Sequence, residues 1–184
     1  MPLDIGIGLL LGILLNSQTD INYELCLLLG VIAALLPDLD FVWQKITGKY
    51  SYLSNHRDGL HYPLLFIPGV SLLGYLFNPW LGIVFALGAL THFIHDSIGL
   101  GWGIKWLFPF SKTSYLLFYK VGLPTNKAQP KKLIYSWTDS ERQIDSEKYA
   151  DPDWIKHIYF QIHPYGIAEY IVLILGITAA IIYK

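Results

Sequence analysis

Five apolar stretches dominate the sequence and limit the folds that it can adopt. They cover residues 3–15, 23–36, 62–77, 80–98 and 165–183. Hydrophobic residues make up 53% of the chain and charged residues only 15%, against about 25% charged residues in ordinary soluble domains. Aromatic residues, which are counted among the hydrophobic ones, make up 15% of the chain, and Trp and Tyr are typical of membrane surfaces. We therefore predict an all-α fold, in which about five helices form an integral membrane bundle.

The first two stretches are shorter than the roughly 20 residues that a membrane span requires. They fit either a tight hairpin of short or tilted membrane helices, completed by flanking polar residues, or the buried hairpin of a soluble protein. The third and fourth stretches favour the membrane. Glycines recur in these apolar stretches, as expected where membrane helices approach each other closely.

Most of the charge lies between the fourth and fifth apolar stretches, in residues 99–163. We predict a polar loop region here, inserted into a single domain that covers residues 1–184. Within it we expect an apolar piece at the membrane interface over 104–110, a short strand over 133–137, and an amphipathic helix over 151–162.

The basic residues predict the orientation of such a bundle. If five helices cross the membrane, every Lys and Arg except Lys184 lies on the side of residues 37–61 and 99–163. By the positive-inside bias this side is cytoplasmic, so we expect a multi-pass protein of the inner cell membrane. The net charge of −1 gives no basic excess, and we expect no nucleic-acid partner. Cys26 is the only cysteine, which excludes an internal disulfide and a site made of several thiolates.

The segment GALTHFIHD, residues 88–96, closes the fourth apolar stretch with two histidines and a carboxylate. His92 and Asp96 are four residues apart, so they share one face of a helix, and His95 lies near it. A nitrogen and an oxygen ligand side by side suit a divalent metal such as zinc or manganese. The alternative is a polar helix end whose histidines contact water or backbone.

Other acidic groups lie on the same predicted side. Asp38 and Asp40 follow the second stretch and offer two hard oxygen ligands, although a solvated loop would look the same. Asp4 is costly in a membrane helix unless it is paired or binds metal, or unless it caps the helix. His163 and Glu169 are six residues apart and share no helical face, so we expect Glu169 to be a packed or snorkelling carboxylate and not a ligand.

A pair of histidines precedes the third apolar stretch. His56 and His61 are five residues apart, and both can reach one metal if Gly59 lets the chain bend. Arg57 lies between them and could hold a phosphate oxygen or pair with an aspartate. The alternative is a basic turn that faces anionic lipid.

The order of four motifs resembles one known family. LLPDLD (35–40), HRDGLHYPLL (56–65), GALTHFIHDSIG (88–99) and GWGIKWLFPFSK (101–112) are similar to motifs of the YdjM-like, LexA-binding, inner-membrane-associated metal-dependent hydrolases. The resemblance implies a small helical membrane bundle, distantly similar to zinc-dependent phospholipase C. It also implies hydrolysis with bound divalent metal.

The resemblance assigns roles to residues by position. It implies metal ligands among the following residues: Asp40, His56, His61, His92 and Asp96. Asp38 would be a general base, a second-metal ligand or a residue that orients a ligand. Arg57 would hold an anionic group. The chain departs from the family in lacking the hydroxyl residues beside His61, and in having Asp4 where a histidine is frequent, which makes Asp4 a further candidate ligand.

Together these patterns predict one or two divalent ions, zinc or manganese, and metal-assisted hydrolysis. A pocket at the level of the lipid headgroups favours membrane lipids as partners and a lipid or lipid-linked phosphoester as substrate. Three alternatives remain open. The metal site could be purely structural, the protein could carry metal ions across the membrane, or it could bind a partner through residues 115–156.

Overall fold

The structure is a computed structural model of the chain, and it describes residues 1–48, 57, 59–99, 101–118, 132–160 and 162–184. These residues are mostly helical. They form two compact units. The first comprises Met1–Pro37, Leu65–His92 and Ile167–Lys184, and the second comprises Asp38–Leu64 and Phe93–Gly166.

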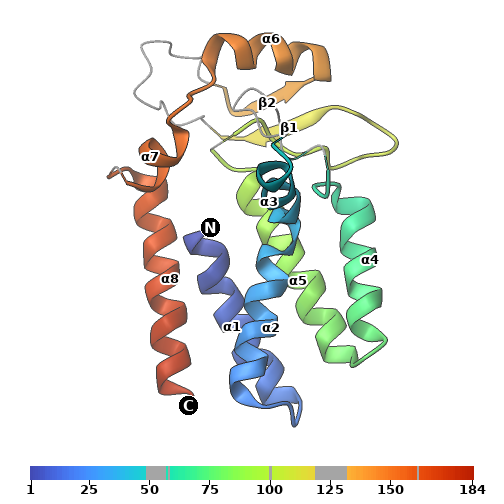
Figure 1. The fold of residues 1–184 in the computed structure, drawn as a ribbon, viewed down its shortest axis with the longest axis vertical. Helices are drawn as coiled ribbons and strands as arrows, with labels where there is room; N and C mark the ends of the chain where they lie inside the picture. Colours follow the sequence, from blue (N-terminus) through green and yellow to red (C-terminus); the bar gives the residue numbers. More distant parts are fainter. Residues whose placement is uncertain (49–56, 58, 100, 119–131, 161) are drawn as a thin grey trace. The chain divides into compact units, whose positions relative to one another are not determined.

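The helices of the first unit form where the apolar stretches predict them. They are α1 (Pro2–Gln18), α2 (Tyr23–Leu35), most of α4 (Pro63–Tyr75), most of α5 (Pro79–Asp96) and most of α8 (Pro164–Ile182). Figure 1 shows these helices as coiled ribbons. Proline begins four of these helices at or next to the first residue, where its missing N–H costs nothing. The sequence therefore predicts these elements closely.

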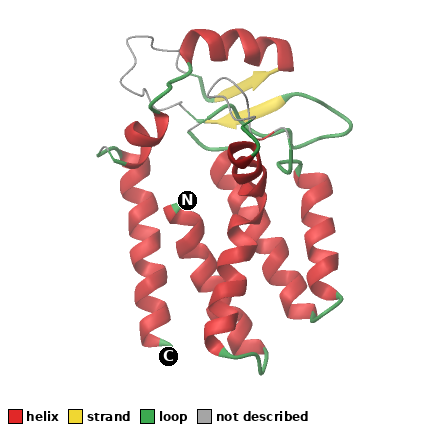
Figure 2. Cartoon of the chain, in the orientation of Figure 1, coloured by secondary structure: helices red, strands yellow, loops and turns green. Residues whose placement is uncertain are grey.

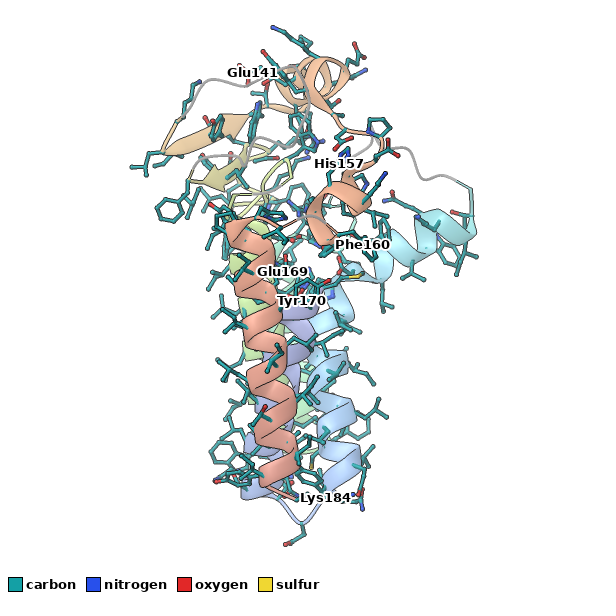
Figure 3. All side chains as sticks on the ribbon, turned by 90° about the vertical axis from the view of Figure 1, so that its left-hand side faces the viewer. Glu141, His157, Phe160, Glu169, Tyr170 and Lys184 are labelled. Atoms are coloured by element: carbon teal, nitrogen blue, oxygen red, sulfur yellow. The ribbon has the colours of Figure 1, made fainter. Side chains whose placement is uncertain are left out.

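Two helical stretches, Tyr23–Ile46 and Pro164–Ile182, are long and apolar enough to cross a membrane by length and composition. Pro2–Gln18 and Pro63–Tyr75 are shorter apolar helices. Along α8, bulky apolar side chains are exposed between Tyr170 and Lys184, as Figure 3 shows. Apolar side chains that point outward are typical of helices that face lipid.

Close backbone contacts hold the first unit together. A side chain at Gly30 of α2 would overlap the backbone of Gly8 and Gly12 on α1. One at Gly6 of α1 would overlap the backbone of Val172 on α8. Beside these contacts lies a core of the following buried residues: Leu11, Leu15, Cys26, Ala33 and Val84. Small residues thus let the helices pack backbone against backbone, as is common between membrane helices.

The second unit contains shorter elements. The 3-10 turn η1 (Leu36–Asp38), whose last residue begins this unit, leads into α3 (Leu39–Ile46), and α6 (Asp139–Tyr149) and α7 (Trp154–Tyr159) follow later in the chain. Strands β1 (Ser114–Leu117) and β2 (Ile134–Trp137) form an antiparallel pair in which Ser114 lies opposite Trp137 (Figure 2). The mostly helical fold thus includes one small sheet, and β2 confirms the short strand that was expected over 133–137.

Several local predictions change in this unit. Helix α3 occupies residues that the sequence suggested were a loop, because the 3-10 turn after Pro37 continues into a new helix. Helix α6 was not predicted, and α7 is shorter than the expected range 151–162. Of the expected interfacial piece, Ile104 is buried and pairs with Tyr115, whereas Phe110 is exposed.

Candidate metal centre

His61 is the centre of a polar cluster in the second unit. Its ring is fully buried, and its Nδ1 lies 2.8 Å from Oδ2 of Asp40. Its other nitrogen, Nε2, lies 3.4 Å from Oδ2 of Asp96 and 3.8 Å from Oδ1 of Asp38. We call Asp38, Asp40, His61 and Asp96 the His61 cluster. Carboxylates thus face both nitrogens of one imidazole.

Asp40 fixes the orientation of the His61 ring. It lies in the first turn of α3, and its Oδ2 also accepts a hydrogen bond from the backbone N–H of Leu60. A side chain at Gly59 would come within 2.9 Å of the Asp40 Cβ, so glycine lets this loop approach the carboxylate. Because an ionised carboxylate only accepts hydrogen bonds, Nδ1 carries a proton and Nε2 is directed toward Asp38 and Asp96.

The cluster favours positive charge at its centre. Burial lowers the pKa of His61, but the hydrogen bonds and negative charges of Asp40 and Asp96 outweigh burial and raise that pKa to about 9. A pKa above neutrality favours the positively charged ring, in which both nitrogens carry a proton. A divalent cation would supply the same compensation for the carboxylates, and its binding would displace a proton.

Arg57 contacts the C-terminal end of α5. Its Nε lies 2.8 Å from Oδ2 of Asp96, and its Nη1 donates to the backbone carbonyl of Asp96 at 3.1 Å. A cation is favourable at this end of a helix because the carbonyl dipoles point there. The sequence suggested that Arg57 holds a phosphate oxygen or pairs with an aspartate. In the structure it pairs with Asp96.

A second histidine–carboxylate pair lies in the first unit. Nδ1 of His92 lies 3.3 Å from Oδ1 of Asp4, and both side chains are buried. The Met1 amine lies 2.8 Å from Asp4 Oδ2 and 3.6 Å from Oε2 of Glu169, which Figure 3 labels near the start of α8. As at His61, a carboxylate faces Nδ1 of the imidazole, but the contact is longer than the 2.8 Å hydrogen bond between His61 and Asp40.

Helix α5 sets the place of His92. It is continuous from Pro79 to Asp96, and the residue after His92, Phe93, packs edge-to-face on the His61 ring with centroids 5.8 Å apart. One ligand atom each from Asp38, His61 and His92 lie within 4.8 Å of one another, so this group could hold a metal ion. These are two nitrogens and an oxygen, a donor set that suits zinc or manganese.

The remaining candidates have other environments. His56 lies outside the described residues. His163 contacts the backbone carbonyl of Ile158 and accepts from the N–H of Gly166, so it supports the start of α8. The nearness of Glu169 to the Met1 amine could not be predicted, because α1 and α8 are far apart in the sequence. The sequence indicated only that an acidic residue within an apolar stretch needs a partner.

A comparison of the sequence with known proteins and protein-family models finds one matching family. The family model described as YdjM inner membrane protein matches residues 4–183. No curated protein and no solved structure gives a significant match. The match covers nearly the whole chain, including all the motifs that first suggested the resemblance. The chain belongs to the YdjM inner membrane protein family.

Proposed function

We propose that this protein is a multi-pass inner-membrane hydrolase that uses a divalent metal, zinc or manganese, to cleave a lipid or lipid-linked phosphoester. The observation that carries the proposal is the convergence of Asp38, His61 and His92 within 4.8 Å. Family membership supports the membrane location. A bound metal would lower the pKa of a water molecule and polarise the ester oxygen.

The geometry suggests that the carboxylates have different roles. Asp40 is hydrogen-bonded to Nδ1 of His61, so it holds the tautomer in which Nε2 is available to a metal. Asp4 lies near Nδ1 of His92 and leaves the Nε2 of that ring available as well. This assignment departs from the sequence prediction, in which Asp40 and Asp4 were themselves ligands. Asp40 retains Oδ1 as a buried acceptor with no hydrogen-bond partner in the described part of the chain.

Asp38 and Asp96 lie on the Nε2 side of His61. Asp38 belongs to the group that could hold the metal, and it is less buried than the histidines. Asp96 is held by Arg57 through both its side chain and its backbone carbonyl. We propose that Asp38 is a ligand that also accepts a proton from the attacking water, and that Arg57 positions Asp96 and balances its charge.

The placement of charge supports a substrate at the membrane surface. The basic residues gather in the segments that carry Asp38, His61 and Asp96, which by the positive-inside bias lie on the cytoplasmic side. We infer that the site lies at the level of the lipid headgroups. A phosphoester of a lipid is the substrate class available there, and it carries the negative charge that a metal and Arg57 would attract.

Elemental analysis of the purified protein tests the metal site. We expect near-stoichiometric zinc or manganese, and its loss in the Asp38→Ala, His92→Ala double variant. His163→Ala is the control, because the hydrogen bonds that His163 makes in the described part of the chain go to backbone groups of its own segment. Metal retained in the double variant, or lost equally in the control, would contradict the assignment.

The role of Asp40 can be tested separately. Asp40→Asn removes the charge at Nδ1 but keeps the size of the side chain, so we expect metal affinity to fall about 10- to 100-fold. Competition with a chromogenic chelator measures this affinity. An unchanged affinity would show that Asp40 does not orient the ligand.

Hydrolysis needs its own assay. In vesicles containing the reconstituted protein, the wild type should release a phosphorylated headgroup or phosphate from a phospholipid, and Asp38→Asn should reduce this release to background.

A structural metal site is the second candidate function. The Arg57–Asp96 pair favours it because the Asp96 carboxylate already has a cationic partner. Stoichiometric metal, a large fall in thermal stability on chelation, and no turnover would support the structural role.

A further inference from the structure

Helix α3 exposes its apolar side. Leu39, Val42, Trp43 and Ile46 recur at helical spacing and are 44–75% exposed. Asp40 lies on another side of the helix and is buried against His61. In a soluble domain the apolar stripe of an amphipathic helix faces the core. The reversed arrangement here is what a helix adopts when its outer side contacts lipid.

Helix α7 lies against α3 and exposes apolar side chains of its own. Trp154 of α7 packs edge-to-face on Phe41 of α3, with ring centroids 6.2 Å apart. On the same short helix and at its end, Ile155 and Phe160 are exposed, and Figure 3 labels Phe160 there. The two helices belong to one unit and pack together through these rings, and each of them also exposes apolar residues.

A pocket of about 470 Å³ lies between the two helices. Lys45 of α3 and Lys156 of α7 line it, together with the apolar and aromatic side chains of Trp154 and Phe160. Asp153 adds one carboxylate. The pocket therefore combines two ammonium groups, one acid and an apolar rim. These are the chemical complements of a phosphate, an amine and the start of an acyl chain.

We propose that this pocket binds the phosphodiester headgroup of a membrane phospholipid, while Trp43, Ile46 and Phe160 insert beside it at the boundary between headgroups and acyl chains. Lys45 and Lys156 contact the phosphate. Asp153 contacts the amine when the headgroup is zwitterionic. The pocket contains none of the metal-site residues, so the inference rests on the proposed membrane location and not on catalysis.

The apolar part is tested by labelling in lipid nanodiscs. In a Cys26→Ala background, a nitroxide on Ile46→Cys should be accessible to oxygen and protected from a water-soluble nickel chelate. A nitroxide on Glu147→Cys of α6 is the matched control, because Glu147 is exposed and lies on a charged helix. Equal accessibility of the two labels to the nickel chelate would overturn the proposal.

The headgroup part is tested by native mass spectrometry of the detergent-solubilised protein with phosphatidylglycerol or phosphatidylethanolamine. We expect Lys45→Gln with Lys156→Gln to weaken lipid retention, by about fivefold for each lysine. The matched control is Lys132→Gln with Lys148→Gln, which removes two exposed lysines outside the pocket.

Three results would overturn the headgroup site: no lipid retention by the wild type, equal losses in the two double variants, or full displacement of lipid by glycerol phosphate. Full displacement would mean that the pocket recognises a free anion and not a lipid. Metal content should stay unchanged in Lys45→Gln, Lys156→Gln. Failure of the headgroup site can thereby be told apart from failure of the metal site.

Discussion

At the scale of single residues, the ion pairs around Lys105 show how the second unit joins its segments. Lys105 is buried, and its ammonium lies 2.7 Å from Oδ1 of Asp139 at the start of α6. Arg142 reaches the same oxygen at 3.1 Å and donates to the hydroxyl of Ser114 on β1. A buried ammonium is costly without a partner. Asp139 therefore links the segment before β1 to α6.

This arrangement predicts a dependence of stability on pH. Burial raises the pKa of Asp139, but the hydrogen bond from Lys105 and the charges of Lys105, Arg142 and Lys112 bring it below its ordinary value of 3.8. Because the folded pKa is the lower one, the stabilisation is present above the ordinary value and is lost as the pH falls through the folded value.

We expect Asp139→Asn to cost about 1 kcal/mol at pH 7, since Asp139 is half-exposed and solvent screens the pair. This corresponds to a fall in Tm of about 2–4 °C. Thermal melting in detergent at neutral and acid pH, with Gln143→Ala as control, measures the effect. The difference from wild type should shrink in acid, and a constant difference would contradict the electrostatic explanation.

Residue spacing in the sequence predicts part of the candidate site. The His-x-x-x-Asp spacing of His92 and Asp96 and the acidic turn at Asp38 predict a shared metal site. Of these residues the structure brings Asp38 and His92 close together, with His61, and the role of each as a ligand stays a prediction. The spacing does not distinguish a carboxylate that binds metal from one that orients a histidine. That distinction for Asp40 depends on which ring nitrogen it faces, and this is set by the loop through Gly59.

At the scale of elements, the contact between α1 and α2 depends on glycine. An added methyl group at Gly30 would come within 2.5 Å of the Gly12 nitrogen and would also overlap the carbonyl of Gly8. By contrast, Gly69 of α4 has no atom within 4 Å of its missing Cβ in the described part of the chain. The two positions form a matched pair for substitution by alanine.

We expect Gly30→Ala to destabilise the protein by about 1–3 kcal/mol, because the backbones must move apart. Gly69→Ala should be neutral or stabilising by up to about 1 kcal/mol, since alanine is the better helix former. Thermal melting of both variants in the same detergent compares them. Equal effects would mean that helix propensity, and not the close contact, dominates at Gly30.

The elements differ in how well the sequence predicts them. The bounds of a long apolar helix such as α8 are predicted nearly to the residue. This is because a helix that is buried in lipid or in a protein core needs an unbroken run of apolar side chains. Helix α6 has no apolar stripe, and its clearest signal is the capping box between Thr138 and Glu141. Helix α3 follows an acidic turn that suggests a loop, and tertiary contacts of Asp40 decide its orientation.

At the scale of the whole molecule, the distribution of charge predicts the topology. Residues of α6 should lie in the cytoplasm, and the turn between α1 and α2 should lie on the opposite side. In a Cys26→Ala background, a membrane-impermeant maleimide should label Glu147→Cys only in inverted vesicles and Asp20→Cys only in intact cells. Labelling of the two sites from one and the same side would contradict the proposed topology.

The two sides of α3 have a practical consequence for purification. The helix contacts His61 through Asp40 on one side and exposes Trp43 and Ile46 on the other. If a short-chain detergent replaces the surrounding amphiphiles and lets α3 shift, the carboxylate at the imidazole shifts with it. The fraction of protein molecules that hold metal should therefore depend on the solubilising agent. It should be highest after gentle extraction that keeps native lipid bound.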